Sequence, residues 1–156
     1  MMERTFIIIK PDAVQRSLLG EIIGRFERKG LKIIGLKMMQ LEDSILEEHY
    51  SHLADKPFFG TIRDFMKSTP VVGVVLEGVD AVNAVRLIVG PTKGREADAG
   101  SIRGDLSMSI QTNVVHASDS LENAKAEISR FFKDEEIFSY KKVDLNFVYS
   151  EDELSQ

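Results

Sequence analysis

Apolar residues in the first quarter of the chain alternate between short continuous runs and helical spacing. Residues 5–9 form a short run rich in isoleucine, which predicts a strand that ends at Pro11. The next apolar residues recur three and four positions apart until Gly30, which predicts a helix; they are Leu18, Leu19, Ile22, Ile23 and Phe26. Residues 31–39 are again β-rich, so we expect a second strand there.

Two further helices are predicted after the second strand. Residues 43–53 begin with Asp43 and Ser44, which are typical N-capping residues. Residues 57–67 continue helically, with Pro57 at a position that suits a first turn. We therefore expect both helices to lie between the second and third strands.

The second half of the chain repeats the strand–helix alternation. Residues 71–76 and 113–116 predict strands, and each is followed by a helix that begins at a capping residue, Asp80 or Ser120. The helix after Asp80 ends at a glycine, and residues 91–112 then show little periodicity. A connection of that length inside a domain is usually functional or mobile.

The major elements read strand-helix-strand twice. This order is the split βαββαβ arrangement of a ferredoxin-like fold, an α+β fold whose four-stranded antiparallel sheet carries helices over one face. No internal repeat or linker is visible, so we predict a single domain over residues 1–150. Residues 151–156 are acidic, and we expect this C-terminal tail to be frayed.

The composition is that of an ordinary globular protein of one domain, with 156 residues, 43% of them hydrophobic and 29% charged. Cysteine is absent, which excludes disulfides and thiolate sites. Apolar runs are too short to span a membrane, and the N-terminus lacks the pattern of a signal peptide, so we expect a cytoplasmic protein. The net charge of −5 opposes general nucleic-acid binding, but local cations can still bind a small anion.

The stretch NVVHASDS places His116 at the end of a predicted strand, before small polar residues. A neutral imidazole acts as a nucleophile at neutral pH when a partner orients one ring nitrogen and the other is open to substrate. Ser118, Asp119 and Glu127 are candidate partners, and the sequence does not choose among them. On the residues alone, a structural histidine bonded to a backbone carbonyl is the commoner explanation.

Positive charge gathers around the long connection. Arg86 lies near the end of one predicted helix and Arg103 at the far end of the loop, and planar guanidinium groups suit phosphate. Arg95 fits a solvated surface arginine. Lys10 ends the first strand, where open sheets often present ligand groups, although an edge lysine with a solvated head group explains it equally well. Neither the Walker motif nor GxGxxG is present.

Aromatic and histidine residues in the predicted helices of residues 43–67 offer further candidates. One of Phe58 and Phe59 can stack on a base, while core packing explains at least one of them. Tyr50 can donate its phenolic hydrogen to a phosphate. His49 and His52 share a predicted helix face but lack a third ligand at a suitable spacing, so we expect both at the surface.

Four segments, in this order and spacing, resemble the nucleoside diphosphate kinase family: ERTFIIIKPDAVQR, KPFFG, GSIRGD and NVVHASDS. The resemblance extends from Glu3 to about Tyr149. It implies the ferredoxin-like fold and ping-pong transfer of a γ-phosphoryl group from a nucleoside triphosphate, mainly ATP, to a nucleoside diphosphate through a phosphohistidine. It also implies Mg²⁺ carried by the nucleotide phosphates, with no metal held by the protein. Members form homo-oligomers, more often hexamers than tetramers, and the family implies neither a membrane nor a specific nucleic acid as partner.

The same resemblance implies roles for the matching residues. His116 is the nucleophile, and Ser118 and Glu127 orient its ring. Lys10 and Asn113 contact the sugar hydroxyl and the phosphates, and Phe58 stacks on the base beside Ile62. The remaining phosphate contacts are Tyr50, Arg86, Thr92 and Arg103.

Three features of the sequence depart from this family pattern or test it. Ala117 stands where the family usually has glycine, and a positive φ there would strain an alanine. The loop PTKGREADAGS lacks the Asn-Pro and Pro-Gly that relatives often have, which leaves its rigidity and its subunit contacts open. Asn113 and His116 are three residues apart, so a regular strand would point them to opposite faces; if both contact nucleotide, the strand must bend or end between them.

Two other functions remain for a fold of this kind, because fold does not determine function. A non-catalytic module would bind a small molecule without becoming labelled by γ-labelled ATP, whereas a kinase would carry acid-labile, base-stable phosphate. An RNA-binding sheet would need exposed strand aromatics and a basic face, which the aliphatic strands and the net charge of −5 oppose.

Overall fold

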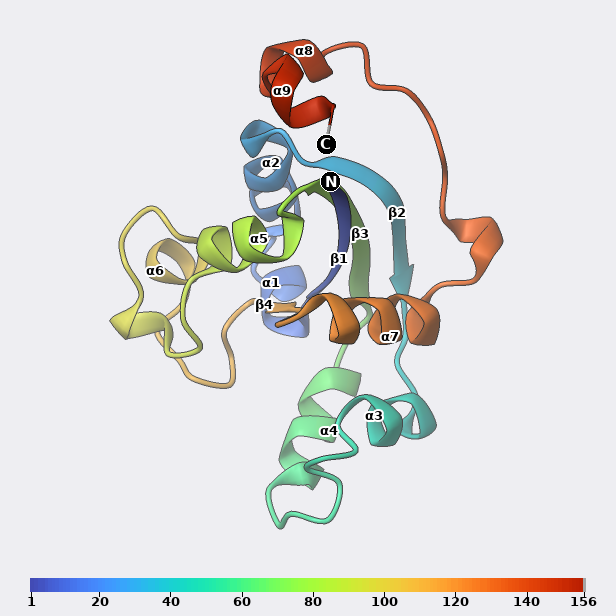
Figure 1. Cartoon of the computed structure of the whole chain (residues 1–156). Helices are drawn as coiled ribbons and strands as arrows, with labels where there is room; N and C mark the ends of the chain where they lie inside the picture. Colours follow the sequence, from blue (N-terminus) through green and yellow to red (C-terminus); the bar gives the residue numbers. More distant parts are fainter. Residues whose placement is uncertain (156) are drawn as a thin grey trace.

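The computed structural model describes residues 1–155 and contains one four-stranded sheet with the strand order β2-β3-β1-β4 (Figure 1). The strands are β1 (Met2–Ile9), β2 (Lys32–Met39), β3 (Val71–Val79) and β4 (Val115–Ala117). Every neighbouring pair is antiparallel, and the short β4 pairs with the C-terminal end of β1, with His116 opposite Ile8. The expected α+β fold with four antiparallel strands is confirmed.

The helices follow the predicted alternation, with additions after β1 and after β3. They are α1 (Pro11–Gln15), α2 (Leu19–Lys29), α3 (Asp43–His49), α4 (Phe59–Lys67), α5 (Ala81–Val89), α6 (Ile102–Leu106), α7 (Leu121–Phe131), α8 (Leu145–Val148) and α9 (Glu151–Leu154), with 3-10 turns η1 (Gly94–Glu96) and η2 (Asp134–Glu136). The side chain of Ser120 accepts a hydrogen bond from the backbone of Asn123, and Gly30 ends α2 with a φ of 102°. These two predicted helix boundaries are therefore confirmed.

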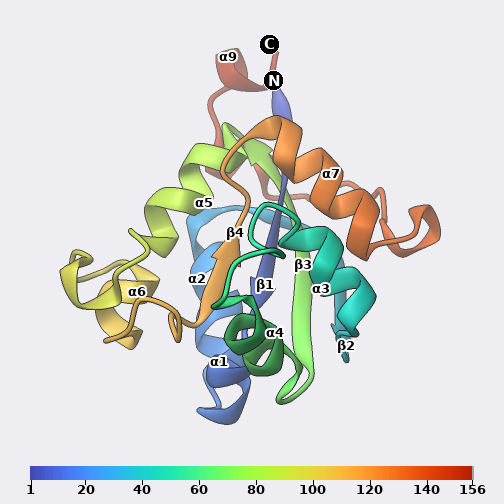
Figure 2. The ribbon, with the colours of Figure 1, turned by 90° about the horizontal axis from the view of Figure 1, so that it is seen from below.

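Helices cover both faces of the sheet, so the expectation of one covered face is wrong (Figure 2). On one face, Ile7 and Ile9 of β1 belong to a core cluster with residues of α2 and α5. On the other, Phe6 and Ile8 belong to a second cluster with residues of α3, α4 and α7. The physical reason is the unbroken apolar run of β1, because a strand without alternation must be buried on both sides.

Several local predictions need correction. Helix α4 begins at Phe59, so Pro57 precedes it rather than entering its first turn. Asp80 precedes α5 but its carboxylate accepts from the side chain of Asn83, at 2.8 Å, instead of capping the helix backbone. The C-terminal tail, expected to be frayed, forms the short helix α9 over residues 151–154.

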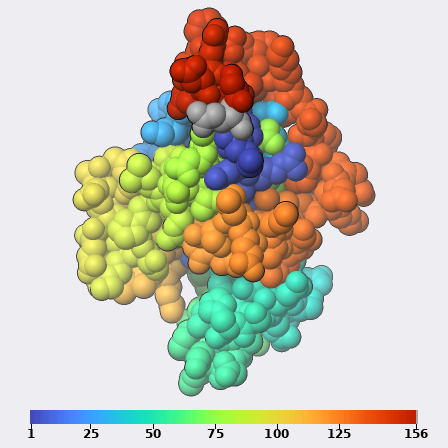
Figure 3. All heavy atoms as spheres, in the orientation of Figure 1, coloured from blue at the N-terminus to red at the C-terminus, as the bar shows by residue number. Residues whose placement is uncertain are grey.

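The segment with α3 and α4 projects from the body of the molecule. Figure 3 shows its atoms as a separate lobe, with a notch between it and the lobe formed by α5 and α6. The end of β4 lies between these two lobes in the ribbon view (Figure 2). None of the helices in residues 1–155 combines the length and the apolar character needed to cross a bilayer.

Candidate active site

The entry into β4 brings two predicted site residues to one cleft. Val114 has a φ of 65°, and β4 begins only at Val115, so the chain turns between Asn113 and His116. Buried Asp12 holds this turn by accepting from the backbone N–H of Val114 at 3.0 Å. Asn113 and His116 consequently line the same cleft of about 300 Å³, as the prediction of a bend or an end in this strand required.

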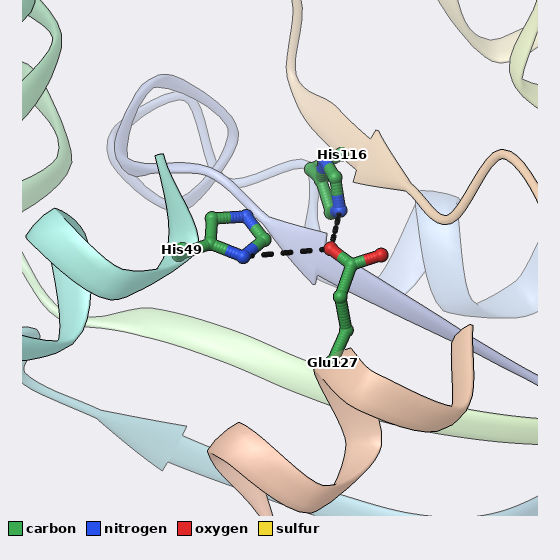
Figure 4. Close-up of side chains that lie close together, drawn as sticks. All are labelled: His49, His116 and Glu127. Carbon is green, nitrogen blue, oxygen red and sulfur yellow. Dashed lines mark hydrogen bonds and ion pairs between the residues drawn. The ribbon is translucent and has the colours of Figure 1, made fainter. Parts of the chain in front are cut away.

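Glu127, from α7, orients the ring of His116 (Figure 4). Its Oε2 lies 2.5 Å from Nε2 of His116, and its Oε1 accepts from the hydroxyl of Ser118 at 2.7 Å. Burial alone would raise the pKa of the Glu127 carboxyl, but the hydrogen bond and charge of His116 and the hydrogen bond from Ser118 outweigh it and lower that pKa. Because an ionised carboxylate only accepts, Nε2 carries the proton and Nδ1 of a neutral ring keeps its lone pair.

The other candidate partner of His116 is engaged elsewhere. The carboxylate of Asp119 accepts from the side chain of Asn123 at 2.5 Å. Ser118 reaches the histidine only through Glu127, since its hydroxyl bonds Glu127 and the backbone carbonyl of Phe6. Of the three partners that the residues allowed, Glu127 is the one in direct contact.

The cleft around His116 is lined with positive charge at fixed positions. Arg103 donates to three backbone carbonyls, those of Asn113 at 3.2 Å, Gly90 at 3.0 Å and Val115 at 2.6 Å. Burial and the nearby charge of Arg86 lower the pKa of Arg103 to about 10, so it remains a cation at neutral pH. A guanidinium held in this way is preorganised for an anionic ligand.

Lys10 and Tyr50 add two hydrogen-bond donors to the cleft. Lys10 donates to the side-chain oxygen of Asn113 at 2.7 Å, and burial followed by the charge of Arg103 lowers its pKa to about 8. Burial and the charge of Glu127 raise the pKa of Tyr50 to about 12, so the phenol stays protonated and able to donate. The cleft therefore offers cationic and neutral donors, the groups that bind phosphate oxygens.

Comparison with known proteins agrees with this arrangement. The family model for nucleoside diphosphate kinase matches residues 3–137. The chain is 55% identical, over 98% of its length and 100% of the relative, to a nucleoside diphosphate kinase of Parabacteroides distasonis. It is 50% identical to one of Archaeoglobus fulgidus, over 96% of this chain and 99% of the relative. The structure of a halophilic nucleoside diphosphate kinase from Halobacterium salinarum in complex with CDP matches with a TM-score of 0.93 at 40% identity, over 96% of this chain and 100% of that chain.

The chain belongs to the nucleoside diphosphate kinase family. It is accordingly a phosphotransferase that binds nucleotides, and the predicted family and activity are confirmed.

Most of the residues predicted to contact nucleotide line the cleft of this nucleoside diphosphate kinase. They are Lys10, Tyr50, Ile62, Arg86, Thr92, Arg103 and Asn113, together with His116. Phe58 is not among the lining residues; its side chain is exposed, whereas Phe59 is buried in the core. Within residues 1–155, therefore, the structure brings together all the predicted contacts except the base-stacking one.

The sequence reasoning missed several residues that line the kinase cleft. They are Phe65, Met66, Val89, Gly90, Ile110, Gln111 and Ala117. Most are apolar, and their helical spacing in α4 and α5 marks them only as core residues. Gln111 and Ile110 lie in the long connection, where a polar or apolar residue carries no periodic signal.

Two expectations about single residues of the kinase are settled by the backbone and by burial. Ala117 is not among the described residues with positive φ, so alanine brings no strain at this position. His49 is buried, contrary to the expectation that it lies at the surface, and its ring packs edge-on against His116 with centroids 4.8 Å apart. Burial and the nearby charge of His116 lower the pKa of His49 to about 3, which keeps it neutral.

Proposed function

We propose that this kinase transfers the γ-phosphoryl group by a ping-pong reaction through Nδ1 of His116. The observation that carries this proposal is the contact of Nε2 with Glu127 Oε2, which leaves Nδ1 as the unprotonated nitrogen. Nδ1 forms a bond to the γ-phosphorus as the bond from that phosphorus to the β–γ bridging oxygen breaks. The nucleoside diphosphate leaves with that electron pair, and a second diphosphate reverses the step.

Glu127 supplies the charge balance in this reaction. When Nδ1 bonds phosphorus and Nε2 keeps its proton, the ring becomes cationic. The carboxylate 2.5 Å away stabilises that charge as it develops, and the hydroxyl of Ser118 holds the carboxylate in place. No proton has to leave the ring, so the step is readily reversible.

The cations around His116 are proposed to hold the phosphate chain. Arg86 and Arg103 stabilise the oxygens of the moving phosphoryl group, because transfer of this kind depends mainly on position and charge. Tyr50 and Thr92 donate to the same phosphates, and Lys10 and Asn113 reach the sugar hydroxyl and phosphates. Because Phe58 is exposed, we propose that it stacks on the base beside Ile62 only when nucleotide is bound.

Mg²⁺ is proposed to arrive with the nucleotide. Among the described residues that line the cleft there is no carboxylate, whereas Lys10, Arg86 and Arg103 are cations. Such a lining suits phosphate and not a resident hard cation, so the oxygen ligands of Mg²⁺ come from the nucleotide, where it neutralises phosphate charge. CDP in the Halobacterium salinarum relative supports nucleoside diphosphates as substrates, and we propose ATP as the main donor.

We also propose a homo-oligomer, with a hexamer favoured over a tetramer, acting in the cytoplasm without a membrane or specific nucleic-acid partner. Large apolar side chains that remain exposed in the single chain support the assembly. Subcellular fractionation tests the location.

The labelling of the protein by γ-³²P-ATP tests the proposed reaction. The wild type is expected to carry acid-labile, base-stable phosphate and to release it to a nucleoside diphosphate, and His116→Ala is expected to carry none. His52→Ala is the matched control, because His52 is exposed. Labelling of the His116→Ala variant at the wild-type level would refute the proposal.

A comparison of Arg103 with Arg95 provides a second test. Arg103→Ala removes a guanidinium tied to three carbonyls in the cleft, whereas Arg95 is exposed and outside it. We expect the transfer rate to fall by about 100-fold or more for Arg103→Ala and to stay unchanged for Arg95→Ala. Equal losses of transfer rate in the two variants would contradict the placement of Arg103 in the active site and of Arg95 at the surface.

A further inference from the structure

Three possible metal ligands from separate elements meet beside the proposed nucleophilic nitrogen (Figure 4). They are Nδ1 of His49 from α3, Nε2 of His116 from β4 and Oε2 of Glu127 from α7, all within 4.8 Å of one another. The oxygen lies 2.5 Å from the nitrogen of His116 and 3.5 Å from that of His49. Such an arrangement requires only small movements to surround one ion, since zinc ligands lie about 2.0–2.2 Å from the metal.

We propose that His49, His116 and Glu127 form a binding site for Zn²⁺, and that occupation of this site blocks phosphoryl transfer. Two imidazoles and one carboxylate are a ligand set typical of zinc, with the fourth tetrahedral position left for water. The same set does not suit Mg²⁺, which requires six oxygen ligands in octahedral geometry. The proposed inhibitor is therefore chemically distinct from the ion that accompanies the nucleotide.

The two ligands other than His116 are already in the state that a metal requires. Arg130 donates to Nδ1 of His49 at 3.0 Å, and since arginine only donates, that nitrogen holds a lone pair. The carboxylate of Glu127 accepts through both oxygens. Ser118 holds Oε1, the oxygen not directed at the histidines, as hydrogen-bonding partners of metal-binding carboxylates commonly do.

The site is reached from solvent through a second cleft, of about 460 Å³, which is lined by all three ligands and by Glu48 and Arg130. Arg130 must turn away from His49 to admit an ion. Its Nε already lies 3.2 Å from the exposed carboxylate of Glu48, which offers the guanidinium an alternative position. Arg130 therefore competes with the metal for His49, both for the lone pair and by its charge.

The block of transfer follows from the two tautomers of His116, and it rests on the proposed role of Nδ1. Zinc on Nε2 requires that nitrogen to release its proton to solvent. A neutral ring then carries its proton on Nδ1, taken from solvent, and has no lone pair left to attack phosphorus. Arg86 lines both clefts, whereas Lys10 and Arg103 line only the nucleotide cleft. Because none of these cations is a zinc ligand, zinc is expected to abolish the chemical step without weakening nucleotide binding.

Zinc binding measured by isothermal titration calorimetry, without nucleotide, tests the site independently of catalysis. We expect one Zn²⁺ per chain. His49→Gln removes a direct ligand and is expected to weaken binding by at least about 100-fold, since loss of a hydrogen-bonding partner of a ligand alone costs about 10- to 100-fold. The exposed-histidine control His52→Gln is expected to leave binding unchanged. Arg130→Gln is expected to bind zinc more tightly, a direction that general damage to the fold would not produce. Circular dichroism of each variant checks folding. Unchanged zinc affinity in His49→Gln, or weaker binding in Arg130→Gln, would overturn the site.

The tautomer of His116 provides the second readout. In ¹⁵N-histidine spectra, zinc is expected to convert His116 from the Nε2–H to the Nδ1–H form. In single-turnover labelling, zinc is expected to reduce phosphorylation more than 10-fold. The dissociation constant of ADP is expected to stay unchanged. If zinc binds and changes the tautomer of His116 but does not reduce labelling, the proposed role of Nδ1 is wrong. The proposed block of phosphoryl transfer by zinc is then wrong as well. Absence of zinc binding in a chain that labels normally would overturn the metal site alone.

Discussion

Among single residues, Ser118 shows how a side chain that does not contact the proposed nucleophile can control it. Its hydroxyl is the donor to the second oxygen of a buried carboxylate, and a hydrogen bond to a charged group contributes about 1.5–3 kcal/mol. Ser118→Ala leaves Glu127 free to rotate, so we expect the labelling rate of His116 to fall about 10- to 100-fold with little change in nucleotide affinity. Stopped-flow or quench-flow labelling measures this rate. Ser120→Ala is the control, since it removes only a helix cap; an equal fall there would contradict the argument.

Lys10 predicts a pH dependence of nucleotide binding. Burial and then the charge of Arg103 lower its pKa to about 8, against the opposing charge of Asp12, so the free enzyme loses this charge as the pH rises through about 8. Phosphate favours the protonated form, so the complex binds more protons than the free enzyme and affinity must fall with rising pH. We expect the dissociation constant of ADP to rise up to about 10-fold per pH unit above pH 8. Calorimetry from pH 7 to 10 measures this dissociation constant. Lys10→Gln is expected to bind ADP more weakly, with a dissociation constant that does not rise over this pH range.

His49 shows a residue property that the local sequence does not contain. The spacing of His49 and His52 suggested an exposed helix face, but α3 ends at His49, whose ring is covered by Phe131 and His116 from distant segments. Burial of that kind is a property of the packed fold. In contrast, the sequence did indicate the bend between Asn113 and His116. Two residues three positions apart on a regular strand point to opposite faces, so both can line one cleft only if the strand bends or ends between them.

At the scale of elements, α6 is the feature that the long aperiodic connection concealed. Five residues give too short a window for periodicity, and the local feature at its start is Ser101, a residue of a type that caps helices. Strands and longer helices were predictable because their signals lie in contiguous residues. The cover on both faces of the sheet was also predictable, from the unbroken apolar run of β1, but the expected fold class placed the helices on one face only.

The cap of α6 gives a prediction for this element. The hydroxyl of Ser101 accepts from the backbone of Gly104 at 3.0 Å, and loss of such a cap costs about 1 kcal/mol. Ser101→Ala is therefore expected to lower the Tm by roughly 2–4 °C. Arg103 lies in α6 but keeps its three carbonyl contacts, so we expect less than about a threefold change in the KM for nucleotide. Calorimetry and steady-state kinetics measure the two effects. If Ser101→Ala raised the KM as much as Arg103→Ala does, the cap of α6 rather than the three backbone carbonyls would position the guanidinium of Arg103.

The whole molecule leaves apolar surface that a single chain does not cover. Strand β2 is an edge of the sheet and exposes Leu36 and Met38, and the C-terminal segment exposes Val143 and Phe147, the latter at 92%. An exposed edge strand with apolar side chains favours association with other chains. Sedimentation velocity is therefore expected to give a multiple of the 17.5 kDa chain mass. The proposal of a hexamer, which rests on the family resemblance, predicts six chains.

The contribution of the C-terminal segment to that assembly is separable from the active site. Phe147→Asp places a charge on the exposed apolar segment, and burying an unpaired charge against another chain is strongly unfavourable. We expect this variant to sediment as smaller species at micromolar concentration, while Lys125→Asp on the exposed side of α7 sediments as the wild type. Because the dissociated variant keeps every residue that lines the cleft around His116, it should still be labelled by γ-³²P-ATP. A wild type that is monomeric at tens of micromolar would contradict the assembly. A dissociated variant that cannot be labelled would instead show that neighbouring chains support the cleft.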